Sequence, residues 1–149
     1  MGVISGGAPN PPSPLCQERL FPCASQDPAS GDGIMGALRA LRVPPDIVEF
    51  DIYFFIDAAL TGAGISFRRE VPLAPRSRID YLAGAVGIEV KRGRWDRRRI
   101  EAQLRRYAGC DAVAELILVT ERAVRLPPDC RGKPVHVLPL RKLWGVALP

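Results

Sequence analysis

The sequence predicts a single α/β domain in which a mixed sheet carries helices on its faces. Two apolar stretches at 78–84 and 86–91 are separated by little more than a turn, which predicts an antiparallel hairpin. Residues 95–109 have the apolar spacing of an amphipathic helix that Gly109 ends. Residues 114–120, AELILVT, form a continuous apolar run, which is typical of a strand covered on both faces.

The first half of the chain supplies two more helices and a strand. Residues 34–43 predict a short helix that ends at Pro44, and Asp46 is the expected N-cap of a helix that runs to about Thr61. Residues 65–73, ISFRREVPL, alternate apolar and charged side chains, as a half-buried strand does.

The ends of the chain complete this plan. Residues 134–140 predict a last strand and residues 141–148 a short C-terminal helix, so we expect a mixed sheet of about five strands. Residues 1–33 are rich in Gly, Pro, Ser and Ala and have little to bury, which predicts a flexible tail in front of a folded domain at 34–149.

Composition narrows the class of protein. With 47% apolar and 25% charged residues the 149-residue chain has the make-up of a soluble globular domain. Its net charge of +5 and pI of about 9.4 favour an anionic partner. The most apolar window, 47–65, contains Glu49, Asp51 and Asp57, too many acids for a bilayer span. We therefore expect a buried helix there and no membrane partner.

The four cysteines are expected to be reduced thiols in a cytoplasmic protein. They are Cys16, Cys23, Cys110 and Cys130. They show no C-x-x-C spacing and the chain has only one histidine, so a metal–thiolate site is not expected. A domain of this size also needs no disulfide to fold. The first 18 residues carry no Lys, no Arg and no apolar run, so no secretory signal is expected there.

Three charged residues stand in the hairpin where apolar neighbours predominate. Glu89 and Lys91 are two residues apart in one strand and so project from the same face, and the turn brings Asp80 of the other strand alongside Glu89. Two adjacent carboxylates repel unless a cation lies between them, and hard oxygen ligands suit Mg²⁺, with the Val90 carbonyl as a possible further ligand. The alternative is a solvated cross-strand ion pair of little energetic weight.

The helix that follows places two polar side chains on its core-facing stripe. That stripe falls on Ile100, Gln103, Leu104 and Tyr107. A buried amide needs hydrogen-bond partners, and a hydrated metal site or a bound phosphate would supply them. The alternative is that Gln103 meets a backbone group and Tyr107 is ordinary packing.

These residues resemble the PD-(D/E)XK nuclease superfamily. The resemblance covers about residues 46–120 and is carried by RID80, GIE89VK91, Q103LRRY107 and ELILVT, in the order helix, three strands, helix, strand. It implies a restriction-endonuclease-like core (αβββαβ), Asp80 and Glu89 as metal ligands, and Lys91 as the catalytic lysine. Gln103 and Tyr107 match the additional motif of RecB-like members. Ile79 replaces the proline of the family name.

A glutamate on the first core helix is a further feature that the resemblance implies. Glu49 is the best match, so it joins Asp80, Glu89, Lys91 and Gln103 as an expected catalytic residue. Glu70 is a rival whose strand parity the sequence leaves open. The resemblance also implies Mg²⁺ as the cofactor, with Mn²⁺ able to replace it.

Basic residues gather directly after the proposed metal site. Residues 91–106 hold eight basic and two acidic side chains, a net charge of +6, whereas the whole chain carries +5. Such a patch would bind phosphates tightly and with little sequence preference. The alternative is a solvated helix face with i,i+4 pairs. Beside the metal site we expect DNA contacts, from Arg92, Arg94, Arg97, Arg98, Arg99, Arg105, Arg106 and Tyr107.

The function predicted from the sequence is therefore Mg²⁺-dependent hydrolysis of DNA phosphodiesters. A small domain without additional recognition modules favours a structure-specific endonuclease similar to Holliday junction resolvases, acting as a homodimer on branched or duplex DNA in recombination or repair. Gln103 and Tyr107 favour the RecB-like exonucleases instead. A non-catalytic nucleic-acid-binding module on the same scaffold is the remaining alternative.

Overall fold

The computed structural model describes residues 29–41 and 49–140, and for Glu49, Phe50 and Asp51 it describes the backbone alone. Helix α1 (Gly31–Arg39) begins three residues earlier than predicted, so the end of the predicted tail is helical. Its N-cap is Ser30, whose hydroxyl oxygen accepts a hydrogen bond of 3.2 Å from the N–H of Gly33. The rest of that tail, the predicted cap Asp46 and the predicted helix at 141–148 lie outside the described residues.

Helix α2 (Glu49–Gly62) confirms the predicted apolar helix, and its C-terminus explains why the first strand starts late. Gly64 has a left-handed backbone with φ of 70°, and the Ile65 N–H bonds back to the Leu60 carbonyl at 2.9 Å. Ile65, 4% exposed, thus belongs to the helix cap. The strand predicted at 65–73 runs instead over Arg68–Ala74 as β1. No helix of the described part of the chain has both the length and the apolarity to cross a membrane.

The sheet has six strands in the order β1-β2-β3-β4-β6-β5, one more than expected. Strands β1, β2 (Ser77–Ala83) and β3 (Val86–Lys91) form an antiparallel meander, which confirms the predicted hairpin. Strand β4 (Glu115–Thr120) lies parallel to β3, and β6 (Lys133–Pro139) lies parallel to β4. The extra strand, β5 (Asp129–Cys130), is a two-residue piece antiparallel to β6.

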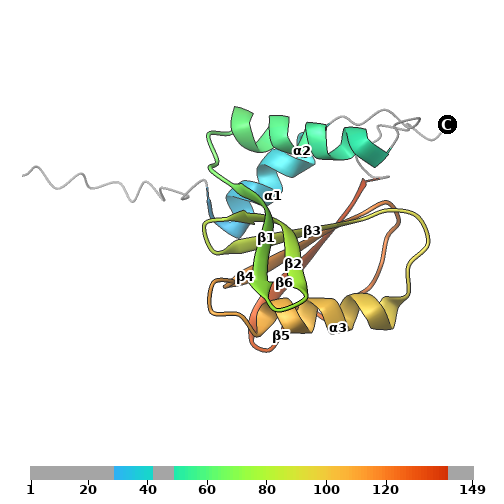
Figure 1. Cartoon of the computed structure of the whole chain (residues 1–149). Coiled ribbons are helices and arrows are strands. Elements are labelled where there is room, and N and C mark those ends of the chain that lie inside the picture. Colours follow the sequence, from blue (N-terminus) through green and yellow to red (C-terminus); the bar gives the residue numbers. More distant parts are fainter. Residues whose placement is uncertain (1–28, 42–48, 141–149) are drawn as a thin grey trace, which may run out of the picture.

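Helices cover both faces of this sheet, α1 and α2 on one and α3 (Arg97–Ala108) on the other (Figure 1). One apolar cluster joins α1 and α2 to the sheet, and a second joins α3 to its opposite face. Strand β4 contributes Ile117 and Val119 to the first cluster and Leu116 and Leu118 to the second. Its continuous apolar run therefore does lie in a strand covered on both sides.

Helix α3 begins where the sequence offers a cap. The Asp96 carboxylate accepts the N–H of Arg98 at 2.7 Å and that of Arg99 at 3.4 Å. The predicted core stripe is confirmed, because Ile100, Leu104 and Tyr107 are each no more than 3% exposed. The helix therefore presents Gln103, one turn before Tyr107, toward the sheet, where this side chain is half-buried.

Candidate active site

The hairpin opens where its two acidic residues stand. Pairing between β2 and β3 runs from Ala83 opposite Val86 to Tyr81 opposite Ile88 and ends there. Beyond this point the Val90 N–H donates a hydrogen bond of 2.7 Å to the Asp80 carboxylate instead of to a backbone carbonyl of β2. The N–H and C=O of a strand residue point to the same side, so the Val90 carbonyl also faces this opening. Asp80 thus contacts the residue next to Glu89, as the predicted hairpin requires.

A paired backbone distortion turns Asp80 into position. Tyr81 packs in the cluster under α1 and α2, whereas Ile79, two residues away, packs in the cluster under α3. Strict alternation would put both on one face, so the strand changes face at Asp80. Glu70 of β1 lies opposite, between the pairs Arg69–Tyr81 and Val71–Ile79, and has a left-handed φ of 52°.

Glu70 is therefore the second acidic residue at this change of face. Its carboxylate forms an ion pair with the Arg78 guanidinium at 2.7 Å, and both side chains are largely exposed. A non-glycine residue in the left-handed region costs about 1 kcal/mol or more. The sequence left the parity of Glu70 open, and the structure shows why, because neither β1 nor β2 keeps a regular alternation here.

Glu89 is buried and held by three side chains. It is 2% exposed, and its Oε1 accepts a hydrogen bond from Gln103 Nε2 at 2.8 Å and contacts the Lys91 ammonium. The Tyr107 hydroxyl lies 3.0 Å from the other oxygen, Oε2. A buried carboxylate is stable only with such partners. The half-buried Gln103 amide thus finds its expected partners in Glu89 and in the Tyr107 hydroxyl, the latter at 2.5 Å.

The Tyr107 hydroxyl joins α3 to both strands of the opening. Besides Glu89 it meets the Arg78 carbonyl at 2.6 Å, and its single proton can serve only one of the two at a time. Burial, and then the charge of Glu89, raise the pKa of Tyr107 well above its ordinary value of 10. The hydroxyl therefore stays protonated and donates to the strand residues.

Electrostatics shows that the two carboxylates interact. Burial raises the pKa of Asp80 to about 6, and the next largest cause is the negative charge of Glu89. The Val90 N–H and the Lys91 ammonium act in the opposite direction, lowering this pKa. Asp80 is therefore ionised at neutral pH at an energetic cost that a nearby cation would relieve.

The donor set fits a hard divalent cation such as Mg²⁺. The Asp80 carboxylate lies at the opening and interacts with the charge of Glu89, and acceptor capacity remains on Asp80 and on Glu89 Oε2, whereas Glu89 Oε1 already has two donors. Among the side chains that the structure describes, no three Asp, Glu, His or Cys residues converge as a metal site. Glu49, the predicted additional acid, is the first residue of α2, and its side chain lies outside the described set.

The basic residues of the predicted DNA-binding patch occupy the loop and helix next to this site. The loop is fixed where the Glu121 carboxylate accepts the Gly93 N–H at 2.9 Å. Arg97 forms an i,i+4 ion pair with Glu101 at 2.7 Å, and Arg92 is half-buried. The patch is otherwise exposed, at Arg94, Arg97, Arg98, Arg99, Arg105 and Arg106.

Tyr107 does not belong to that patch, and this part of the prediction is wrong. Its ring is 1% exposed and its hydroxyl points to Glu89 and Arg78, so it has no surface for a nucleic acid. The core-stripe assignment, made from the same helix, was the correct one. Trp95, at the head of α3, packs against the same cluster and is only partly exposed.

The site thus brings together side chains from β2, β3 and α3, namely Asp80, Glu89, Lys91, Gln103 and Tyr107. The site lies at the carboxyl end of β3, beside the parallel strand β4, which is where open α/β sheets place ligands. No protein-family model, no curated protein and no solved structure matches the chain.

Proposed function

We propose that this protein is a Mg²⁺-dependent deoxyribonuclease that hydrolyses phosphodiester bonds. We rank endonucleolytic cleavage of branched DNA ahead of exonuclease activity. The observation that carries the proposal is the convergence of Asp80, Glu89 and Lys91 at the end of an opened hairpin. A structural ion pair alone would not require β2 and β3 to separate at that point. The resemblance to PD-(D/E)XK nucleases supports the same assignment.

Each residue of the site has a role in this proposal. Asp80 and Glu89 hold the cation, which would supply Lewis-acid stabilisation of the charge that develops on the phosphate. Lys91, 28% exposed, presents its ammonium to the attacking water and to the phosphate oxygens. Gln103 and Tyr107 fix the orientation of Glu89 and are positioning residues.

The exposed arginines of the loop and α3 hold the DNA backbone. Arg94, Arg98 and Arg99 are exposed and lie within eight residues of Lys91 in sequence. Contacts of this kind fix the register of the nucleic acid without reading bases, and their strength falls steeply with salt. A dimer of the chain would present two such sites to a four-way junction.

One observation favours a second candidate, a DNA-binding module without catalysis. The Lys91 ammonium already contacts Glu89, so the buried negative charge has a partner within the protein. In such a module the three charged residues would be structural, and the basic patch alone would act.

A cleavage assay separates these functions. End-labelled four-way junction, nicked duplex, linear duplex and single-stranded DNA are incubated with the protein, with Mg²⁺ or with EDTA. We expect Mg²⁺-dependent, symmetrically placed cuts in the junction, and retained binding without cuts in Lys91→Ala. Progressive shortening from DNA ends would identify an exonuclease, and binding without cleavage by the wild type would establish the inert module.

A further inference from the structure

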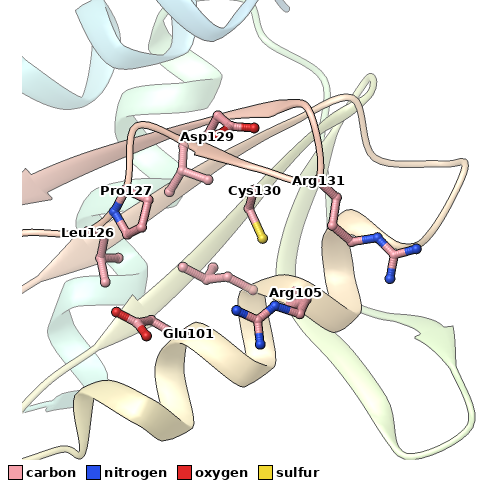
Figure 2. Close-up of a pocket in the computed structure, with 9 residues that line it drawn as sticks. Glu101, Arg105, Leu126, Pro127, Asp129, Cys130 and Arg131 are labelled. Carbon is pink, nitrogen blue, oxygen red and sulfur yellow. The ribbon is translucent and has the colours of Figure 1, made fainter.

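A pocket of about 160 Å³ lies between α3 and the segment that leads into β6 (Figure 2). It is distinct from the candidate active site. Glu101 and Arg105 line it, and they are two positions removed from Gln103 and Tyr107, so they project from a different side of the helix. The remaining lining residues are Leu104, Leu126, Pro127, Asp129, Cys130, Arg131 and Val135.

The two acidic groups of this pocket already have partners. Glu101 accepts from Arg97 Nε at 2.7 Å. Asp129 Oδ2 accepts the Gly132 N–H at 2.8 Å, which fixes the turn between β5 and β6. The charge of Glu101 is therefore paired with that of Arg97, whereas Asp129, which meets only a neutral backbone donor, keeps its negative charge.

The two guanidinium groups remain available. Within the described residues, 29–41 and 49–140, the guanidinium groups of Arg105 and Arg131 make no hydrogen bond and no ion pair. Figure 2 shows the Arg105 guanidinium on α3 below the Cys130 thiol, with Arg131 at the end of the pocket near the end of that helix. The Glu101 charge is paired with that of Arg97, and the remaining charged groups of the pocket are Arg105, Arg131 and Asp129. Together these three leave one net positive charge, which suits a monoanion.

Apolar walls complete the pocket and set the size of what it can hold. Leu104 and Val135, 3% and 8% exposed, belong to the core, and Leu126 and Pro127 lie across from α3. An apolar cavity of roughly 150 Å³ accommodates one benzene ring. The volume here is of that order, so the pocket has room for one ring or a branched alkyl group of similar size.

We propose that this pocket binds a small aromatic or branched-chain monocarboxylate. The planar carboxylate matches the fork of the Arg105 guanidinium, which forms two parallel charge-assisted hydrogen bonds with such a group. The apolar body lies against Leu104 and Val135, next to the Cys130 thiol. The ligand thereby bridges α3 and the β5–β6 hairpin. This proposal needs neither DNA nor a metal, and it uses Arg105, one of the exposed arginines proposed to contact the DNA backbone.

Benzoate is the probe, and the Cys130 thiol reports its binding. The full chain is alkylated with iodoacetamide, in which a sulfur–carbon bond forms and iodide leaves, and modification is measured site by site by mass spectrometry. Cys110, the other thiol that the structure describes, is the internal reference. We expect benzoate to slow alkylation of Cys130 at least fivefold and that of Cys110 by less than twofold.

Two arginine variants test the anchor. Arg105→Gln should weaken benzoate protection about tenfold, because it removes a charge-assisted bidentate contact. Arg106→Gln is the matched control, since this exposed arginine is the next residue on α3 and does not line the pocket. It should leave protection unchanged. Fluorine NMR of 4-fluorobenzoate measures the same affinities without using the thiol.

Several results would overturn the proposal. Equal protection by the neutral isostere benzamide would remove the role of the anion, and protection by phenyl phosphate but not benzoate would remove the assignment to carboxylates. Fluorobenzoate binding that leaves Cys130 unprotected, or that Arg105→Gln does not weaken, would place the ligand elsewhere. No binding of benzoate by the wild type would refute it outright.

Discussion

Gln103 donates a hydrogen bond of 2.8 Å to the buried carboxylate of Glu89, and so ties the middle of α3 to the strand that carries Lys91. The contact joins two elements that are fourteen residues apart in sequence. It also gives a buried charge one of its few donors, and its removal should therefore affect both folding and chemistry.

The first prediction concerns this contact. Gln103→Leu keeps the size of the side chain but deprives Glu89 of a donor, which should lower the free energy of unfolding by about 1–3 kcal/mol. Mg²⁺-dependent cleavage should fall roughly 10–100-fold, as when a partner of a metal ligand is lost. Urea denaturation and single-turnover cleavage measure the two effects. Gln103→Glu, which places a like charge at the same distance, should be worse on both counts.

Tyr107→Phe separates the structural role of Tyr107 from the DNA contact first predicted for it. The variant retains the buried ring and loses the hydroxyl that joins Glu89 to the Arg78 carbonyl. We expect a loss of about 1–2 kcal/mol in the free energy of unfolding, since a buried acceptor is left without its donor. Affinity for duplex DNA, measured by fluorescence anisotropy, should not change. A large drop in affinity for the folded variant would show that the residue contacts DNA after all.

The sequence was sufficient for most of the fold, and its failures have local causes. The hairpin and β4 were predictable because their apolar patterns are set by burial on known faces. Strand β5 was not, because two residues carry no periodicity. Ile65 looked like the start of a strand, but Gly64 adopts a left-handed backbone, and this makes Ile65 the last residue of a helix cap.

The structure brings together four of the five predicted catalytic residues, Asp80, Glu89, Lys91 and Gln103, whereas the side chain of Glu49 lies outside the described residues. The spacing of Glu89 and Lys91 places both on one face of a regular strand, and their contact confirms this. The orientation of Asp80 was not predictable by counting, because β2 changes face at that residue. Tyr107 was assigned to both the core and the DNA surface, and only tertiary packing could decide between them.

The raised pKa of Asp80 has a consequence for stability. In the unfolded chain this carboxyl titrates near 3.8 and in the fold near 6, so the folded chain binds more protons between these values. Its contribution to the free energy of unfolding should therefore fall as pH rises from about 4 to 6 and stay constant above.

Asp80→Asn tests this sign in metal-free protein. The variant should gain on the wild type across that pH range, by on the order of 1 kcal/mol, a value reduced because the carboxylate is partly exposed. Asn retains an acceptor for the Val90 N–H. Thermal unfolding in EDTA at pH 4.5 and pH 8 gives the comparison, with Asp111→Asn, at an exposed aspartate, as the control. A gain that is the same at both pH values would mean that Asp80 is not perturbed.

Glu70→Gly tests the strain opposite Asp80. Glycine adopts the observed φ of 52° without a steric cost, and only an exposed ion pair with Arg78 is lost. We expect a gain of roughly 0.5–1 kcal/mol in the free energy of unfolding by urea denaturation. Arg76→Gly, at a φ of 57° in the β1–β2 turn, is the matched control and should gain a similar amount. A loss of stability in Glu70→Gly alone would mean that its side-chain contacts outweigh the strain.

The most direct test of the shared cation site is a Mn²⁺ titration followed by electron paramagnetic resonance at pH 8. The wild type should bind Mn²⁺ at one site from which Mg²⁺ displaces it, and Asp80→Asn and Glu89→Gln should each weaken this binding at least tenfold. Asp129→Asn, in the pocket on another side of α3, should have no effect. If the wild type binds no Mn²⁺, or if neither the Asp80 nor the Glu89 substitution weakens the binding, there is no shared cation site.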